Sequence, residues 1–179
     1  MTDQQKINYL KTYYPLAVEA GKQYNINPVV IVAQSIHESG WGTSYGARIR
    51  RNFFGITSYG SKNTYWNGAK SMNNAGTISF RVYKTAKDSF FDFARLIKEV
   101  YPSAAGVSSD YAQYAKAIAN SKYISESNGD NRPAYEKAII DNSKFIISNL
   151  ATIEAYLKNA ASNILPAIGL GLLIAILLH

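Results

Sequence analysis

Apolar residues recur at steps of three and four along much of the chain, which is the spacing of one helix face. This pattern predicts a helix over residues 4–24 that is interrupted near Pro15, because proline lacks the amide hydrogen that a helix interior needs. It also predicts helices over 85–101 and 110–120, and a long helix that begins at Pro133. Thr85 and Asp88 have the spacing of a capping box at the start of the first of these.

A different pattern, apolar on nearly all sides, runs from Pro28 to Ser39 and predicts a buried helix. Asn27 is suited to cap it and Gly40 to end it. Glu38 therefore lies at the carboxyl end of a core helix, where the helix dipole and apolar surroundings both raise a carboxyl pKa. A carboxyl group that stays protonated near neutral pH can act as a general acid. The alternative is an ordinary solvated carboxylate at a helix end.

Apolar and polar residues alternate strictly over Thr77–Tyr83, which predicts a strand. We expect its partner strand at 64–70 and the turn between them at 73–76. The segment 40–76 is long and rich in Gly, Ser, Asn and aromatic residues, which indicates a functional loop. Two helices, a small β-hairpin and three or more further helices predict a mostly helical α+β domain with two lobes. We expect a polymeric substrate in the cleft between the lobes.

Composition narrows the range of partners. The chain has no cysteine and two histidines, so we expect neither a metal site nor a cofactor. The net charge of +7 favours a polyanionic partner, such as nucleic acid, anionic lipid or a bacterial cell-wall polymer. Because the basic residues are scattered, we expect no nucleic-acid binding. The 14 tyrosines and 2 tryptophans are suited to stacking on sugars.

Two separated blocks of the sequence carry a family resemblance. They read Ala33-Gln34-x-x-x-Glu38-Ser39-Gly40-Trp41-Gly42-Thr43-Ser44 and Asn52-Phe53-Phe54-Gly55-Ile56. Together they resemble the signature of the peptidoglycan-cleaving glucosaminidases of glycoside hydrolase family 73. Weaker similarity continues in Phe80–Tyr83, in Ser89–Phe93, and in Tyr123-Ile124-Ser125-Glu126 followed by Tyr135, so that the resemblance covers roughly residues 5–150.

This resemblance implies a lysozyme-like fold and hydrolysis of the β-1,4 bond between N-acetylglucosamine and N-acetylmuramic acid in peptidoglycan glycan strands. Glu38 falls on the catalytic acid of the family, and Tyr123 falls on its active-site tyrosine; the alternative for Tyr123 is a buried packing residue. Members often carry a second acid on the β-hairpin, but residues 52–87 contain no Asp or Glu. Only Glu126 and Asp130, in the loop after Tyr123, are placed to reach the cleft.

The missing acid favours a mechanism with one carboxylic acid, in which Glu38 protonates the leaving oxygen and the substrate's own 2-acetamido group attacks the anomeric carbon. Tyr123 then orients that group. A lytic transglycosylase and a non-catalytic peptidoglycan-binding module are the alternatives. The expected substrate-binding residues are Asn52, Tyr45, Tyr59, Tyr65, Trp66 and Glu126, of which Asn52 contacts either a sugar or the catalytic loop.

The carboxyl end differs from the rest of the chain, so we expect a domain at residues 1–158 and a hydrophobic helical tail at 159–179. Ile164–Leu178 has no charge and gives about 22 Å as a helix, or about 28 Å if the helix starts at Ala160, against about 30 Å of bilayer hydrocarbon. We expect residues 160–179 to contact a membrane. The alternatives are a core helix or an oligomer contact.

The polar start, Met1–Lys6, shows no signal peptide. For an enzyme that acts at the bacterial cell wall or in the periplasm, this indicates delivery by a phage or phage-like injection particle, with tail proteins as partners. Release of a prophage-encoded or tail-anchored lysis protein from within the cell is the second route.

Overall fold

The computed structural model describes residues 1–125 and 131–164, and in this part of the chain the protein is mostly helical with one small sheet. The elements are α1 (Asp3–Tyr24), α2 (Pro28–Ser39), α3 (Tyr45–Arg50), β1 (Lys70–Met72), β2 (Ser79–Arg81), α4 (Ala86–Val100), α5 (Pro102–Gly106), α6 (Tyr111–Ala119) and α7 (Arg132–Ile164). The predicted α+β class, with a β-hairpin between two sets of helices, is confirmed.

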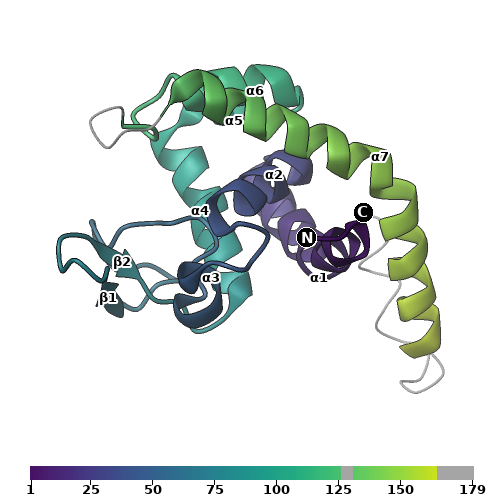
Figure 1. The fold of residues 1–179 in the computed structure, drawn as a ribbon, viewed down its shortest axis with the longest axis horizontal. Helices are drawn as coiled ribbons and strands as arrows, with labels where there is room; N and C mark the ends of the chain where they lie inside the picture. Colours follow the sequence, from purple (N-terminus) through teal and green to yellow (C-terminus); the bar gives the residue numbers. More distant parts are fainter. Residues whose placement is uncertain (126–130, 165–179) are drawn as a thin grey trace.

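Helix α2 lies at the centre of the molecule and packs against α1, α6 and α7 (Figure 1). Its predicted limits are confirmed: the Asn27 side chain accepts a hydrogen bond from the amide of Val29, and Gly40 ends the helix in the left-handed conformation. Residues 29–36 are buried without exception, so the helix is enclosed on all sides. Glu38 is half-buried at the carboxyl end of the helix, and Ser39 after it is again fully buried.

Helix α1 runs through Pro15 without a break, so the predicted interruption is wrong. A proline inside a helix costs about 3 kcal/mol. Buried side chains lie on both sides of it, Leu10 and Tyr14 before and Ala17 and Ala20 after, and the helix packs against both α2 and α4. Tertiary packing of the two halves therefore outweighs the local preference.

The hairpin is shorter than predicted and its first strand lies later in the chain. Strand β1 starts at Lys70, which pairs with Arg81, and Met72 pairs with Ser79. The turn at 73–76 is confirmed, because the Asn73 side chain accepts the amides of Thr77 and Ile78. The prediction of a partner strand at 64–70 is wrong for most of its length: the side chain of Asn63 accepts the amides at 65 and 66, which turns this segment away from strand geometry.

Two short helices, α3 and α5, were not expected. Helix α3 lies within the segment predicted to be irregular, and the Ser44 hydroxyl caps it by accepting the amide of Ala47. It lies beside the hairpin on one side of α2, while α5, α6 and the start of α7 lie on the other side (Figure 1). The two predicted lobes therefore flank the end of α2 that carries Glu38.

Asp92 joins the hairpin to α4 from a fully buried position. Its Oδ2 accepts hydrogen bonds from Arg81 (2.6 Å) and the Tyr83 hydroxyl (2.8 Å). Its Oδ1 accepts from Asn63 (2.8 Å) and from Arg95 of its own helix. This carboxylate fixes the hairpin lobe to the helical core.

Helix α7 continues past the expected domain boundary at residue 158 and is described as far as Ile164. In the described part of the chain, no helix is both long and apolar enough to cross a membrane. The expected tail helix falls largely on residues 165–179, which lie outside the described residues.

Candidate active site

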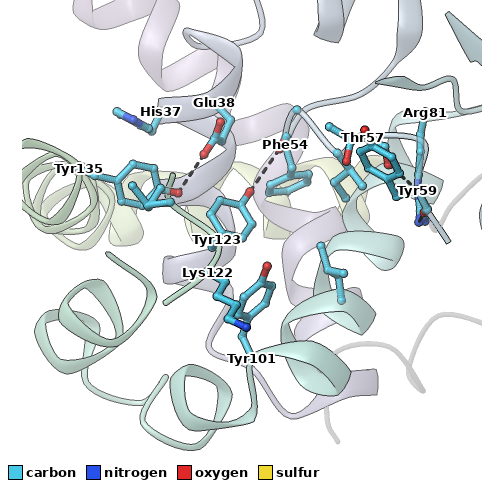
Figure 2. A pocket seen from close by; sticks show the side chains of 14 residues that line it. His37, Glu38, Phe54, Thr57, Tyr59, Arg81, Tyr101, Lys122, Tyr123 and Tyr135 are labelled. Carbon is cyan, nitrogen blue, oxygen red and sulfur yellow. Dashed lines mark hydrogen bonds between the residues drawn. The ribbon is translucent and has the colours of Figure 1, made fainter. Parts of the chain in front are cut away.

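Two pockets meet at Glu38 and Gly55. The larger, about 390 Å³, is lined by His37, Phe54, Tyr101, Tyr123 and Tyr135 among others (Figure 2). The smaller, about 180 Å³, is lined by Ser44, Gly46, Arg50, Asn52 and Phe80. Because Glu38 and Gly55 line both pockets, the half-buried Glu38 borders each of them.

A chain of hydrogen bonds from the core holds Glu38. The hydroxyl of Tyr135 donates to its Oε1 over 2.9 Å, as Figure 2 shows. The same hydroxyl accepts from the Gln34 amide nitrogen over 2.8 Å, and the Gln34 amide oxygen accepts from the Tyr114 hydroxyl. Gln34 and Tyr114 are fully buried, so residues of α2, α6 and α7 together fix the direction of the Tyr135 hydroxyl.

The loop that follows α3 passes beside the other carboxyl oxygen. Gly55 has a φ of +61°, and a Cβ placed there would lie 3.6 Å from Glu38 Oε2. Asn52 shapes this loop: its Oδ1 accepts the amide of Ile56 over 3.0 Å, and its Nδ2 donates to the carbonyl oxygens of Ile56 and Arg81. Asn52 is 2% exposed, so of the two roles expected for it the structure gives it the loop contact.

Tyr123 lies across the larger pocket from the hairpin lobe, and its hydroxyl donates to the carbonyl oxygen of Phe54 over 3.2 Å (Figure 2). Its ring lies between those of Tyr101 and Tyr135, with centroids 5.6 and 6.3 Å away. Burial raises the pKa of Tyr123 and of Tyr135 well above the ordinary value, and the nearby Glu38 raises both further. Both hydroxyls are therefore protonated hydrogen-bond donors near neutral pH.

Of the four rings expected to stack on sugars, only Tyr59 lines the larger pocket, where it is 80% exposed. Tyr45 is exposed beside the smaller pocket, against the Arg50 guanidinium. The Tyr65 hydroxyl accepts a hydrogen bond from the side-chain amide nitrogen of Gln23 and is hydrogen-bonded to the Tyr24 hydroxyl, so it faces α1, away from both pockets. Trp66 is 3% exposed, with Arg81 against its ring and its Nε1 bonded to Ala69, so it is a packing residue.

Glu38 is the one acid among the described residues that line the two pockets. Glu126 and Asp130, which the sequence places near the cleft, lie outside the described residues. Over residues 1–125 and 131–164, no group of three His, Cys, Asp or Glu side chains is arranged to hold a metal ion. Among the described residues that line the two pockets, the groups suited to proton transfer are the Glu38 carboxyl and the hydroxyls of the surrounding tyrosines.

Sequence reasoning missed two residues that position Glu38, namely Gln34 and Tyr135. Gln34 stands four residues before Glu38, hence on the same helix face, and this spacing was the available signal. Tyr135 entered the sequence analysis only as part of the weaker similarity, with no role, and its bond to Glu38 spans 97 residues. No local pattern reports such a contact.

Residues 14–161 match the glucosaminidase family, described as mannosyl-glycoprotein endo-beta-N-acetylglucosaminidase. The chain belongs to this family. A curated relative from Streptococcus pneumoniae serotype 4, named "Putative endo-beta-N-acetylglucosaminidase", is 33% identical over 94 residues, which are 52% of this chain. This glucosaminidase-family chain spans only 14% of the length of that relative.

Solved structures agree with this glucosaminidase-family assignment at the level of the fold. The glycoside hydrolase domain of Salmonella typhimurium FlgJ superposes with a TM-score of 0.64 at 19% identity, covering 91% of this chain and 99% of that domain. The catalytic domain of the autolysin Auto from Listeria monocytogenes gives 0.57 at 20% identity, covering 86% and 89%. The expected lysozyme-like architecture is confirmed by these similarities.

Proposed function

We propose that this protein hydrolyses the β-1,4 bond between N-acetylglucosamine and N-acetylmuramic acid in peptidoglycan, with Glu38 as the general acid. The observation that carries the proposal is the position of Glu38, half-buried where two pockets meet, with one carboxyl oxygen held by Tyr135 at 2.9 Å. A glycan strand that fills both pockets places a glycosidic bond beside this group. Family membership supports the same reaction.

The hydrogen-bond chain supports a position for the transferable proton on one of the two carboxyl oxygens of Glu38. The Gln34 amide nitrogen can only donate to Tyr135, and so the single hydroxyl proton of Tyr135 points to Glu38 Oε1. When Glu38 is protonated, its own proton therefore resides on Oε2, which faces the backbone at Gly55. We place the glycosidic oxygen of the substrate at Oε2.

The reaction then runs in two steps. Glu38 gives its proton to the glycosidic oxygen as the C–O bond breaks, and the oxygen of the substrate's 2-acetamido group bonds to the anomeric carbon. Water next attacks that carbon, the bond from the carbon to the acetamido oxygen breaks, and the ionised Glu38 takes a proton from the attacking water. Tyr123 keeps its own proton on the Phe54 carbonyl oxygen, and its hydroxyl oxygen accepts a hydrogen bond from the acetamido N–H and orients that group.

The first test is clearance of purified cell walls by Glu38→Gln. This change keeps the side-chain volume and removes the transferable proton, so we expect loss of lysis with the fold intact by circular dichroism. Glu19→Gln, an exposed carboxylate on α1, is the matched control and should lyse normally. Lysis at the normal rate by Glu38→Gln would refute the role of Glu38.

Further measurements separate the competing schemes. If Glu126→Gln or Asp130→Asn abolishes lysis in a folded protein, the one-acid scheme is wrong and a second carboxylate takes part. An anhydro sugar at the new chain end, detected by mass spectrometry, would identify a lytic transglycosylase instead of a hydrolase. Sedimentation with cell walls without clearance would identify a non-catalytic binding module.

We also propose that residues 159–179 form a segment distinct from the domain and that residues 160–179 contact lipid. The uncharged run from Ile164 to Leu178 supports this proposal. Flotation with liposomes, with and without residues 160–179, tests it; equal behaviour of both forms would refute it. For delivery, we propose carriage by a phage or phage-like particle in contact with its tail proteins, and detection of the protein in purified particles is the test.

A further inference from the structure

Arg50, at the end of α3, is a buried arginine in the wall of the smaller pocket. Its side chain is enclosed, with 8% of the residue exposed. The guanidinium lies 4.7 Å from the ring centroid of Tyr45 and 5.1 Å from that of Phe80. One amino group, Nη2, donates to the carbonyl oxygen of Met72 over 2.7 Å.

The charge of Arg50 has no partner of opposite sign in the described part of the chain. No carboxylate there lies within ion-pair distance, and the buried Nε has no hydrogen-bond acceptor. Arg81, a second buried arginine of the same lobe, differs from Arg50 in this respect, because its guanidinium forms an ion pair with Asp92 over 2.6 Å. Buried charges are normally paired, and contacts with ring faces compensate only in part for lost hydration. Arg50 is thus a cation whose counter-ion the described residues do not supply.

Its location identifies where that counter-ion would come from. The smaller pocket, about 180 Å³, is lined by Arg50 and also by Glu38 and Gly55. A sugar bound there lies next to the bond that Glu38 protonates in the proposed function. A substituent of that sugar is therefore the group nearest to the unpaired guanidinium.

We propose that the smaller pocket binds a carboxylate carried by the substituent on the 3-oxygen of N-acetylmuramic acid, with Arg50 as its partner. In an intact strand the lactyl carboxyl of that substituent is joined to a short peptide, and the bound group is a carboxylate of the peptide. Guanidinium groups bind carboxylates through charge-assisted hydrogen bonds. This inference rests on the proposed function and adds to it a preference for peptide-bearing over neutral glycan.

Binding, rather than cleavage, tests the inference, so that a failure of hydrolysis and a failure of this site give different results. In the Glu38→Gln background, calorimetry would compare three ligands. They are a neutral N-acetylglucosamine oligomer, a peptidoglycan fragment stripped of peptide, which exposes the lactyl carboxylate, and the same fragment with its peptide.

Adding Arg50→Met should weaken binding of the peptide-bearing fragment about tenfold relative to binding of the neutral oligomer. This is the effect expected from the loss of one charge-assisted hydrogen bond. Arg50→Lys, which keeps the charge, should retain most of this preference. Arg48→Met changes an exposed arginine of the same helix and should leave the ratio unaltered. Equal weakening of all three ligands by both Arg50 variants, or no change in their ratio, would overturn the proposal. A loss confined to the stripped fragment would assign the site to the lactyl carboxylate and refute peptide recognition.

Discussion

Replacement of Asp92 by asparagine should destabilise the protein far more than a surface change of the same kind. The substitution keeps the shape of the side chain but removes the negative charge. It also places an amide nitrogen against groups that all donate. Arg81, whose side chain is 6% exposed, would then be a buried cation without a counter-ion.

The size of the effect follows from these contacts. Breaking a buried ion pair by removing one partner costs about 3–5 kcal/mol. The total stability of a domain of this kind is about 5–15 kcal/mol. For a chain of this length each kcal/mol shifts Tm by about 2–4 °C, so Asp92→Asn should lower Tm by about 6–20 °C.

Urea and thermal unfolding, followed by circular dichroism, would measure the change. Asp141→Asn is the matched control, because Asp141 forms an exposed pair with Lys137 one helical turn away and such pairs contribute less than about 1 kcal/mol. A loss below about 1 kcal/mol for Asp92→Asn would refute the reasoning. Arg81 also donates to the carbonyl oxygens of Thr57 and Tyr59 in the pocket wall. We therefore expect Asp92→Asn to lower the rate of cell-wall lysis as well as the stability.

Three further predictions concern the site and its tyrosines. Tyr135→Phe should lower kcat on cell walls about 10- to 100-fold, the equivalent of one hydrogen bond to a charged group, and an unchanged kcat would show that this bond does not position Glu38. Gly55→Ala forces a side chain into the left-handed region beside Glu38 Oε2, so we expect a loss of about 1–2 kcal/mol in unfolding experiments and a larger relative loss of lysis; activity retained in full would argue against proton transfer from Oε2. Burial raises the pKa of several tyrosines above the unfolded value of about 10, so their contribution to stability is complete below that pH and is lost as pH rises above it, by up to about 1.4 kcal/mol per pH unit for each. The affected residues are Tyr9, Tyr83, Tyr114, Tyr123 and Tyr135. Urea midpoints at rising pH would measure this, and a stability that stays constant above pH 10 would contradict it.

Local signals in the sequence were enough to locate the helices that carry their own start and stop chemistry. Asn27 and Gly40 delimit α2 in the structure as they do in the sequence, and Thr85 forms a capping box with Asp88. Glu38 was identified for the same reason, since its position depends only on where a buried helix ends. These features require no knowledge of distant contacts.

The rest depends on residues that meet only in three dimensions. The passage of α1 through Pro15 follows from packing on two other helices, and the Asn63 turn diverts the segment 64–70, which the sequence analysis predicts to be the partner strand. Trp66 has the type of aromatic side chain that stacks on sugars, but the Arg81 guanidinium lies against its ring. The roles of Gln34 and Tyr135 depend on hydrogen bonds between α2 and α7, and no sequence window contains both helices.

The length of α7 limits the distance between Glu38, the proposed general acid, and whatever the far end of this helix contacts. Tyr135, which touches Glu38, stands near its start, and the described helix ends at Ile164. At about 1.5 Å per residue, the path between them is at most about 44 Å. A lipid surface or protein bound at the far end would therefore confine cleavage to glycan within a shell of that thickness around the point of attachment.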